Sequence, residues 1–113
     1  MHFDATIREL AEADVVAFAG VGLMSRVLPV TEAYREMSAA VRDGEAVRPH
    51  LDWLLANGTP AGKVYGATLL AELDPDAARA AWRQLAGQTG DVTTFSGCIM
   101  NKVPLAEYAA GRL

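Results

Sequence analysis

The stretch TPAGKVYGATLLAELDPDAARAAWRQLAG, residues 59–87, contains the strongest structural signals in the chain. Thr59 and Asp74 are each followed directly by proline. Thr and Asp side chains cap helix N-termini, and proline is tolerated at the first helical position. The pattern therefore predicts two helices, over 60–73 and over 75–86.

The helix predicted over 60–73 carries apolar side chains around almost its whole circumference. A helix of this kind is buried on more than one side, so we expect it at the centre of the fold. Its expected neighbours are a helix over 45–56 and the helix over 75–86, joined to it by short turns. Gly62 and Gly66 would let a neighbour approach closely.

The helix over 75–86 has one apolar face and is expected on the outside of the bundle. Its predicted buried residues are Ala78, Ala81, Trp82 and Leu85. Gly58 and Gly87 follow the last apolar positions of two helices, and we expect both in the left-handed conformation that commonly ends a helix.

Two further helices are predicted towards the N-terminus. Thr31 is expected to cap an amphipathic helix over 31–43, and Asp4 a short helix over 5–13. In the segment 45–56 the regular helix is expected to begin near Pro49, because proline in mid-helix removes a hydrogen bond.

Two regions lack a clean helical period. Residues 15–30, VVAFAGVGLMSRVLPV, are apolar and expected to be buried. Residues 91–103 contain the β-branched and aromatic run VTTFSGCIMN and predict either a small strand pair or irregular packing, before a last short helix begins at Pro104.

Residues 51–87 resemble a HEAT-type helical repeat, with a helix, a tight turn, a second helix rich in small residues and a capped Asp-Pro restart. The predicted fold is all-α: a single domain over 1–113 with five to six helices, a HEAT-like antiparallel hairpin at its core and a less regular C-terminal tail. The resemblance implies that the chain binds other proteins along a helical face.

Composition excludes several classes of function. The 113 residues are 51% hydrophobic and carry a net charge of −4, which argues against nucleic acid as a partner. The longest uncharged stretch, Val15 to Ser25, is well short of the ~20 residues that span a bilayer. The first residues are acidic where a secretory signal would be basic, so we expect a cytoplasmic protein with no membrane partner.

The candidates for chemistry are Cys98 and His50, since a cysteine with a histidine nearby is the minimum for thiol catalysis. A buried free cysteine and a histidine at the core edge are the commoner explanations, so we favour a role without catalysis. One cysteine and two histidines predict no metal site, and we expect no cofactor.

The predicted partner-binding residues are Trp53, Trp82, Arg79 and Arg83, because Trp and Arg anchor interfaces more often than other residue types. Arg79 and Arg83 lie one turn apart on the predicted outer helix.

These observations predict a small acidic protein-protein interaction module. Its expected partner is another, basic protein, and one concrete form is an inhibitor or immunity-type protein that covers a basic toxin. The alternative is a small-ligand-binding protein or enzyme with a pocket near His50 and Cys98. If residues 15–30 are not covered by the chain itself, we expect a homodimer through them.

Overall fold

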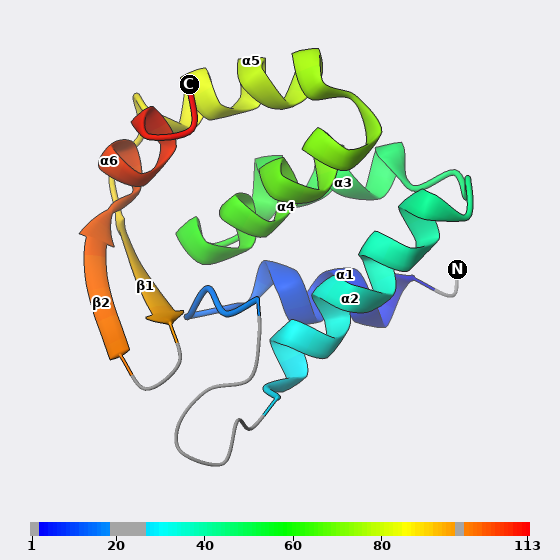
Figure 1. Cartoon of the computed structure of the whole chain (residues 1–113). Helices are drawn as coiled ribbons and strands as arrows, with labels where there is room; N and C mark the ends of the chain where they lie inside the picture. The colour runs from blue at the N-terminus through cyan, green and yellow to red at the C-terminus, as the bar shows by residue number, and fades with distance from the viewer. Residues whose placement is uncertain (1–2, 19–26, 97–98) are drawn as a thin grey trace.

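The computed structural model describes residues 3–18, 27–96 and 99–113, and these form six helices and two strands (Figure 1). The helices are α1 (Asp4–Ala11), α2 (Pro29–Arg42), α3 (Arg48–Asn57), α4 (Pro60–Leu73), α5 (Pro75–Leu85) and α6 (Leu105–Ala110), and the strands are β1 (Asp91–Ser96) and β2 (Ile99–Pro104).

Helix α4 lies at the centre of the fold, as its apolar circumference predicts. It packs against α1, α2, α3, α5 and β1. Val64, Tyr65 and Leu69 on this helix are fully buried. Its first turn is capped as expected, because the backbone N–H of Gly62 donates to the Thr59 hydroxyl at 3.0 Å.

Both predicted close approaches to α4 occur. A Cβ atom built on Gly62 would lie 2.6 Å from the carbonyl oxygen of Leu10, so α1 crosses the start of α4 in near-contact with its backbone. A Cβ atom on Gly66 would lie 3.2 Å from the side chain of Leu55 in α3. Small residues on α4 thus allow both neighbours to pack tightly.

Helix α5 confirms its predicted cap and its buried face. The Ala77 N–H donates to the Asp74 carboxylate at 3.2 Å, and Ala78, Ala81, Trp82 and Leu85 are all buried. The expected left-handed helix ends are wrong: Gly58 is extended with φ −75°, and the glycines with positive φ among the described residues are Gly44 and Gly90.

The two N-terminal helices form where expected, but their caps differ. Helix α1 already includes Asp4, and α2 begins at Pro29 with Leu28 before it. The Thr31 hydroxyl therefore lies inside α2, where it donates to the carbonyl oxygen of Ala17 at 2.6 Å. A tertiary contact, rather than capping, uses this side chain.

Residues 15–18 are held against the centre of the fold by their backbone. The Tyr65 hydroxyl accepts a hydrogen bond from the Ala17 N–H at 2.7 Å and donates to the Ala17 carbonyl at 3.0 Å. Val16 pairs with β1, because its N–H donates to Thr93 and its carbonyl accepts from Phe95. Val16 and Ala17 are buried, as expected for this apolar segment, but Phe18 is 36% exposed, against that expectation.

The mostly helical fold is confirmed, but the all-α class is wrong. Strands β1 and β2 form an antiparallel pair in which Asp91 pairs with Pro104 and Ser96 with Ile99. Of the two possibilities for residues 91–103, the strand pair occurs. The physical reason is the run of β-branched and aromatic residues, Val92 to Phe95, which favours extended backbone once Val92 packs into the core.

Candidate functional site

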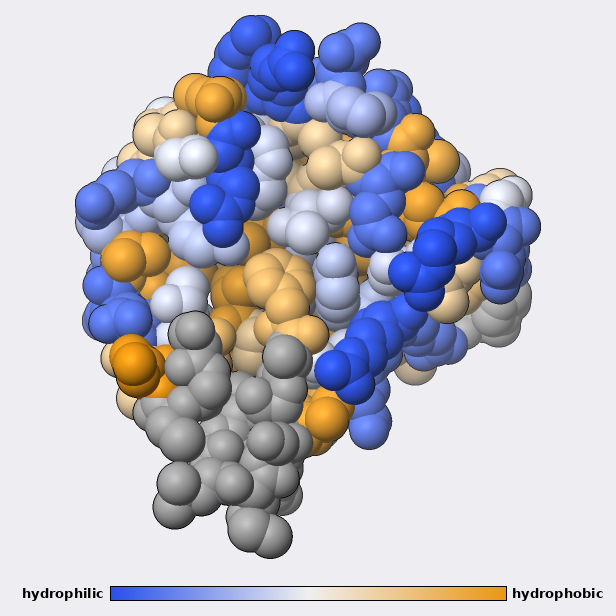
Figure 2. Space-filling view, in the orientation of Figure 1, coloured by the Kyte–Doolittle hydropathy of each residue, from blue (hydrophilic) through white to orange (hydrophobic). Residues whose placement is uncertain are grey.

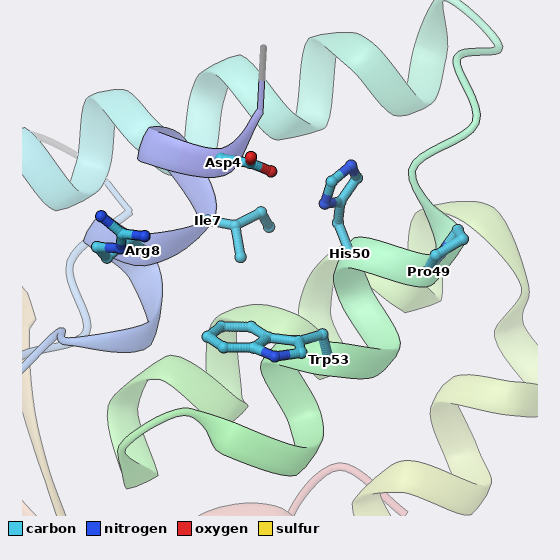
Figure 3. A pocket seen from close by; sticks show the side chains of 6 residues that line it. All are labelled: Asp4, Ile7, Arg8, Pro49, His50 and Trp53. Carbon is cyan, nitrogen blue, oxygen red and sulfur yellow. The ribbon is translucent and has the colours of Figure 1, made fainter. Parts of the chain in front are cut away.

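A cleft of 310 Å³ lies between α1 and α3 (Figure 3). It is lined by three residues of α1 and three of α3, namely Asp4, Ile7, Arg8, Pro49, His50 and Trp53. On each helix these positions lie three or four residues apart or adjacent, so each helix turns one face towards the cleft.

Buried residues next to the cleft hold the two helices in place. Leu51 and Leu54 anchor α3 in the core, and Ile7 is almost fully buried at the base of the cleft. The Phe3 ring meets the His50 ring edge to face, with the centroids 5.9 Å apart. The imidazole is therefore packed on one side by an aromatic ring and lines the cleft with its remaining surface.

Trp53 is the most prominent side chain of the cleft. It is 49% exposed, although it is one of the largest apolar side chains in the protein. In Figure 3 its indole ring extends from α3 beneath Ile7, so one face of the ring lines the cleft.

The charges of the cleft are divided between its two ends. Figure 3 shows the Asp4 carboxylate pointing towards His50, and Arg8 lying beyond Ile7 on the far side. An apolar group bound on Ile7 and Trp53 would therefore have a carboxylate at one end and a guanidinium at the other. Such a cleft suits an apolar side chain with polar neighbours, and its volume is at the lower end of the ~300–1,000 Å³ typical of small-molecule sites.

The four predicted partner-binding residues do not form one surface. Trp82 is 5% exposed and packs against Tyr108, so it belongs to the core and cannot reach a partner. Arg79 and Arg83 are exposed on α5, where Arg79 lies 3.8 Å from Asp76, and α5 contributes no residue to the cleft. Of the four, Trp53 alone lines a described cavity with other candidate residues.

The proposed combination of His50 and Cys98 is only partly described. Cys98 lies outside the described residues, and no residue of β1 or β2 lines the cleft at His50. Within residues 3–18, 27–96 and 99–113, no three His, Cys, Asp or Glu side chains are grouped so that they could hold a metal ion.

A second cavity, of 380 Å³, lies between α2 and α4. Its polar centre is the Glu72 carboxylate, which accepts hydrogen bonds from Ser38 at 2.7 Å and from the Tyr34 hydroxyl at 3.4 Å. Burial and the negative charge of Glu72 raise the pKa of Tyr34. Arg42 in turn donates to Ser38, so these four side chains form a hydrogen-bonded group that joins α2 to α4.

A third, smaller pocket of 210 Å³ lies beside the C-terminal end of α1. Three carboxylates, Glu9, Glu12 and Asp14, line it together with apolar groups of residues 13–15 and 28–30. All three acidic residues are exposed. This is an acidic rim around an apolar floor, on a surface that the sequence did not single out.

Sequence reasoning missed Asp4, Ile7 and Arg8 as site residues. They lie more than forty positions from His50, and no local pattern links the two segments. Of the described residues in the segment 15–30, Val16, Ala17 and Val30 are buried, whereas Phe18 and Pro29 are exposed. Residues 19–26 lie outside the description, so the dimer through 15–30 stays a prediction.

Comparisons with protein-family models, with curated proteins and with solved structures find no match to this chain. No helix in the described ranges has the length and apolarity that crossing a membrane requires.

Proposed function

We propose that the protein is a small acidic interaction module that binds another protein through the cleft between α1 and α3. The observation that carries this proposal is the exposure of Trp53, 49%, beside 5% for Trp82. An exposed tryptophan at the wall of a cleft is the kind of residue that anchors interfaces, because it brings a large apolar area into contact at little entropic cost.

The charge distribution supports a basic partner. The chain carries a net charge of −4, and Glu9, Glu12 and Asp14 line a pocket at the C-terminal end of α1, the helix whose first residue, Asp4, lines the cleft. A partner that inserts an apolar side chain beside Trp53 could place lysine or arginine against these carboxylates. An inhibitor or immunity-type protein that covers a basic toxin would use such a surface, and the cytoplasm is its expected location.

The test is capture from native lysate with the purified full chain, compared between wild type, Trp53→Ala and Arg83→Ala. We expect a stoichiometric basic protein that is released by salt, retained by Arg83→Ala and lost by Trp53→Ala. Arg83 is a suitable control because it is exposed on α5, away from the cleft. A partner lost by Arg83→Ala and kept by Trp53→Ala would move the interface to α5 and contradict the proposed site.

The second candidate function is binding of a small molecule in the same cleft, with or without catalysis. The observation that favours it is the position of His50 and Asp4 on facing walls of a 310 Å³ cavity. A compound that raises the Tm of wild type but not of His50→Ala would support this candidate. Loss of turnover in Cys98→Ala with unchanged binding would indicate an enzyme.

A further inference from the structure

Strand β2 is the outer strand of the sheet. The strand order is β1–β2, and the other side of β1 is occupied by Val16. Figure 1 places β2 at the margin of the molecule, with no other helix or strand of the described residues on its far side. An edge strand of this kind presents unpaired backbone groups that can accept another strand.

The hydrogen bonds of β1 establish which groups of β2 face outwards. The Thr93 carbonyl and the Phe95 N–H are used by Val16, and alternate residues of a strand direct their backbone groups to opposite sides. The backbone N–H and C=O of Thr94 therefore point towards β2, and those of its partner Asn101 point back towards β1. It follows that Met100 and Lys102 direct their N–H and C=O groups away from the sheet.

The side chains at the start of this edge are apolar and exposed. Ile99 is 62% exposed and Met100 is 60% exposed. Figure 2 shows strongly hydrophobic atoms on the left side of the molecule, the side on which Figure 1 places β2. Exposed apolar side chains beside unpaired backbone groups are typical of a surface that another chain covers.

We propose that the occupant of this edge is β2 of a second copy, paired antiparallel about a two-fold axis at Asn101. In this register Met100 of each copy faces Lys102 of the other copy. The outward N–H and C=O groups of both residues, four on each strand, therefore all form hydrogen bonds across the interface. The apolar side chain of Ile99 then lies opposite Val103 of the second copy, and the two Asn101 amides face each other.

Neighbouring registers are less favourable, and this specifies the pairing. A shift of the axis to Lys102 places two like charges directly opposite each other and brings Pro104, which has no N–H, into the ladder. A shift of the axis to Met100 places Lys102 opposite a position before Ile99, the first residue of the other strand, so the backbone groups of Lys102 have no strand partner. In the register centred on Asn101 the two lysines stay apart, and each lies 3.8 Å from Asp91 of its own chain.

The test compares Met100→Lys with Met100→Glu, because the two substitutions have opposite effects only in this register. In the proposed dimer, residue 100 of each copy faces Lys102 of the other copy, so this pair occurs twice. Met100→Lys makes both pairs like-charged, whereas Met100→Glu makes both pairs oppositely charged. We expect sedimentation equilibrium to show a wild-type dimer, and dimerisation of Met100→Lys to be about tenfold weaker than that of Met100→Glu. Position 100 is exposed, so neither variant should alter the circular dichroism of the monomer.

Amide hydrogen exchange adds a readout that is specific to the strand edge. With rising protein concentration, the N–H groups of Met100 and Lys102 should become protected, while that of Asn101, already paired with β1, should change little. Equal weakening by both substitutions would mean an apolar contact without strand pairing. A dimer that neither substitution affects would place the interface elsewhere, for instance in 15–30, and a monomer at every concentration would mean that Lys102 and Pro104 protect a free edge. Each of these three results would overturn the proposal.

Discussion

Replacement of Tyr65 by phenylalanine tests how the segment 15–18 is held against the core. The Tyr65 hydroxyl is the hydrogen-bond partner of both the N–H and the carbonyl of Ala17, and Ala17 is 1% exposed. Without the hydroxyl, the Ala17 carbonyl keeps its bond from Thr31 at 2.6 Å, but the buried N–H loses its partner.

The expected magnitude follows from that one unpaired donor. A buried polar group left without a partner costs about 1–3 kcal/mol, so we expect Tyr65→Phe to lower the free energy of unfolding by about 2 kcal/mol. For a domain of this size that corresponds to a fall in Tm of about 10 °C. Urea denaturation should show a lower midpoint with an unchanged m-value, because the surface exposed on unfolding stays nearly the same.

Tyr34→Phe is a matched control, since the same atom is removed at a half-exposed position. The Tyr34 hydroxyl makes a 3.4 Å contact with Glu72, so its loss should cost less than about 0.5 kcal/mol. Thr31→Val should be intermediate, because the Ala17 carbonyl keeps the bond from Tyr65. If Tyr65→Phe is no less stable than Tyr34→Phe, the Tyr65 hydroxyl does not hold residues 15–18 against the core in the way described.

Three further predictions concern the environment of α4. Gly62→Ala should destabilise the protein by about 1–3 kcal/mol in thermal denaturation, because its Cβ would lie 2.6 Å from the Leu10 carbonyl oxygen. Gly87→Ala is the control and should be close to neutral, because the nearest atom to its Cβ lies 3.6 Å away. Equal effects of the two substitutions would contradict the close approach of α1. Thr59→Ala should cost about 1–2 kcal/mol in urea, since it removes both the cap on Gly62 and a hydrogen bond to the Ala13 carbonyl, and Thr59→Ser should restore most of the loss. Burial raises the pKa of Tyr65 from 10.0 to about 12, so between these pH values the folded state keeps a proton that the unfolded state has lost. The contribution of this group to the free energy of unfolding is therefore fully present below pH 10 and is lost as the pH rises from 10 to 12. Tyr65→Phe should lack this part of the pH dependence of stability.

Several elements could be predicted from signals that act locally along the chain. Thr59-Pro60 and Asp74-Pro75 specify the starts of α4 and α5, because a capping side chain and a proline act within one turn of their own positions. The all-round apolar pattern of α4 also predicted its central position, since such a helix has no face that water can cover favourably. The buried face of α5 followed from its period alone.

Residues of the same type have different roles in this fold, because contacts between distant segments determine which groups each side chain meets. Thr31 has the chemistry of a cap, but the carbonyl of Ala17 lies within its reach, and this long-range hydrogen bond could not be predicted from neighbours in sequence. Trp53 and Trp82 are the same residue type, yet Tyr108 of α6 packs against Trp82, which is 5% exposed, whereas Trp53 is 49% exposed and lines the cleft between α1 and α3. The cleft itself needs α1 beside α3. Val16 covers the second edge of β1, so β2 is left as the open edge of the sheet, and this arrangement requires residues far apart in the sequence to meet.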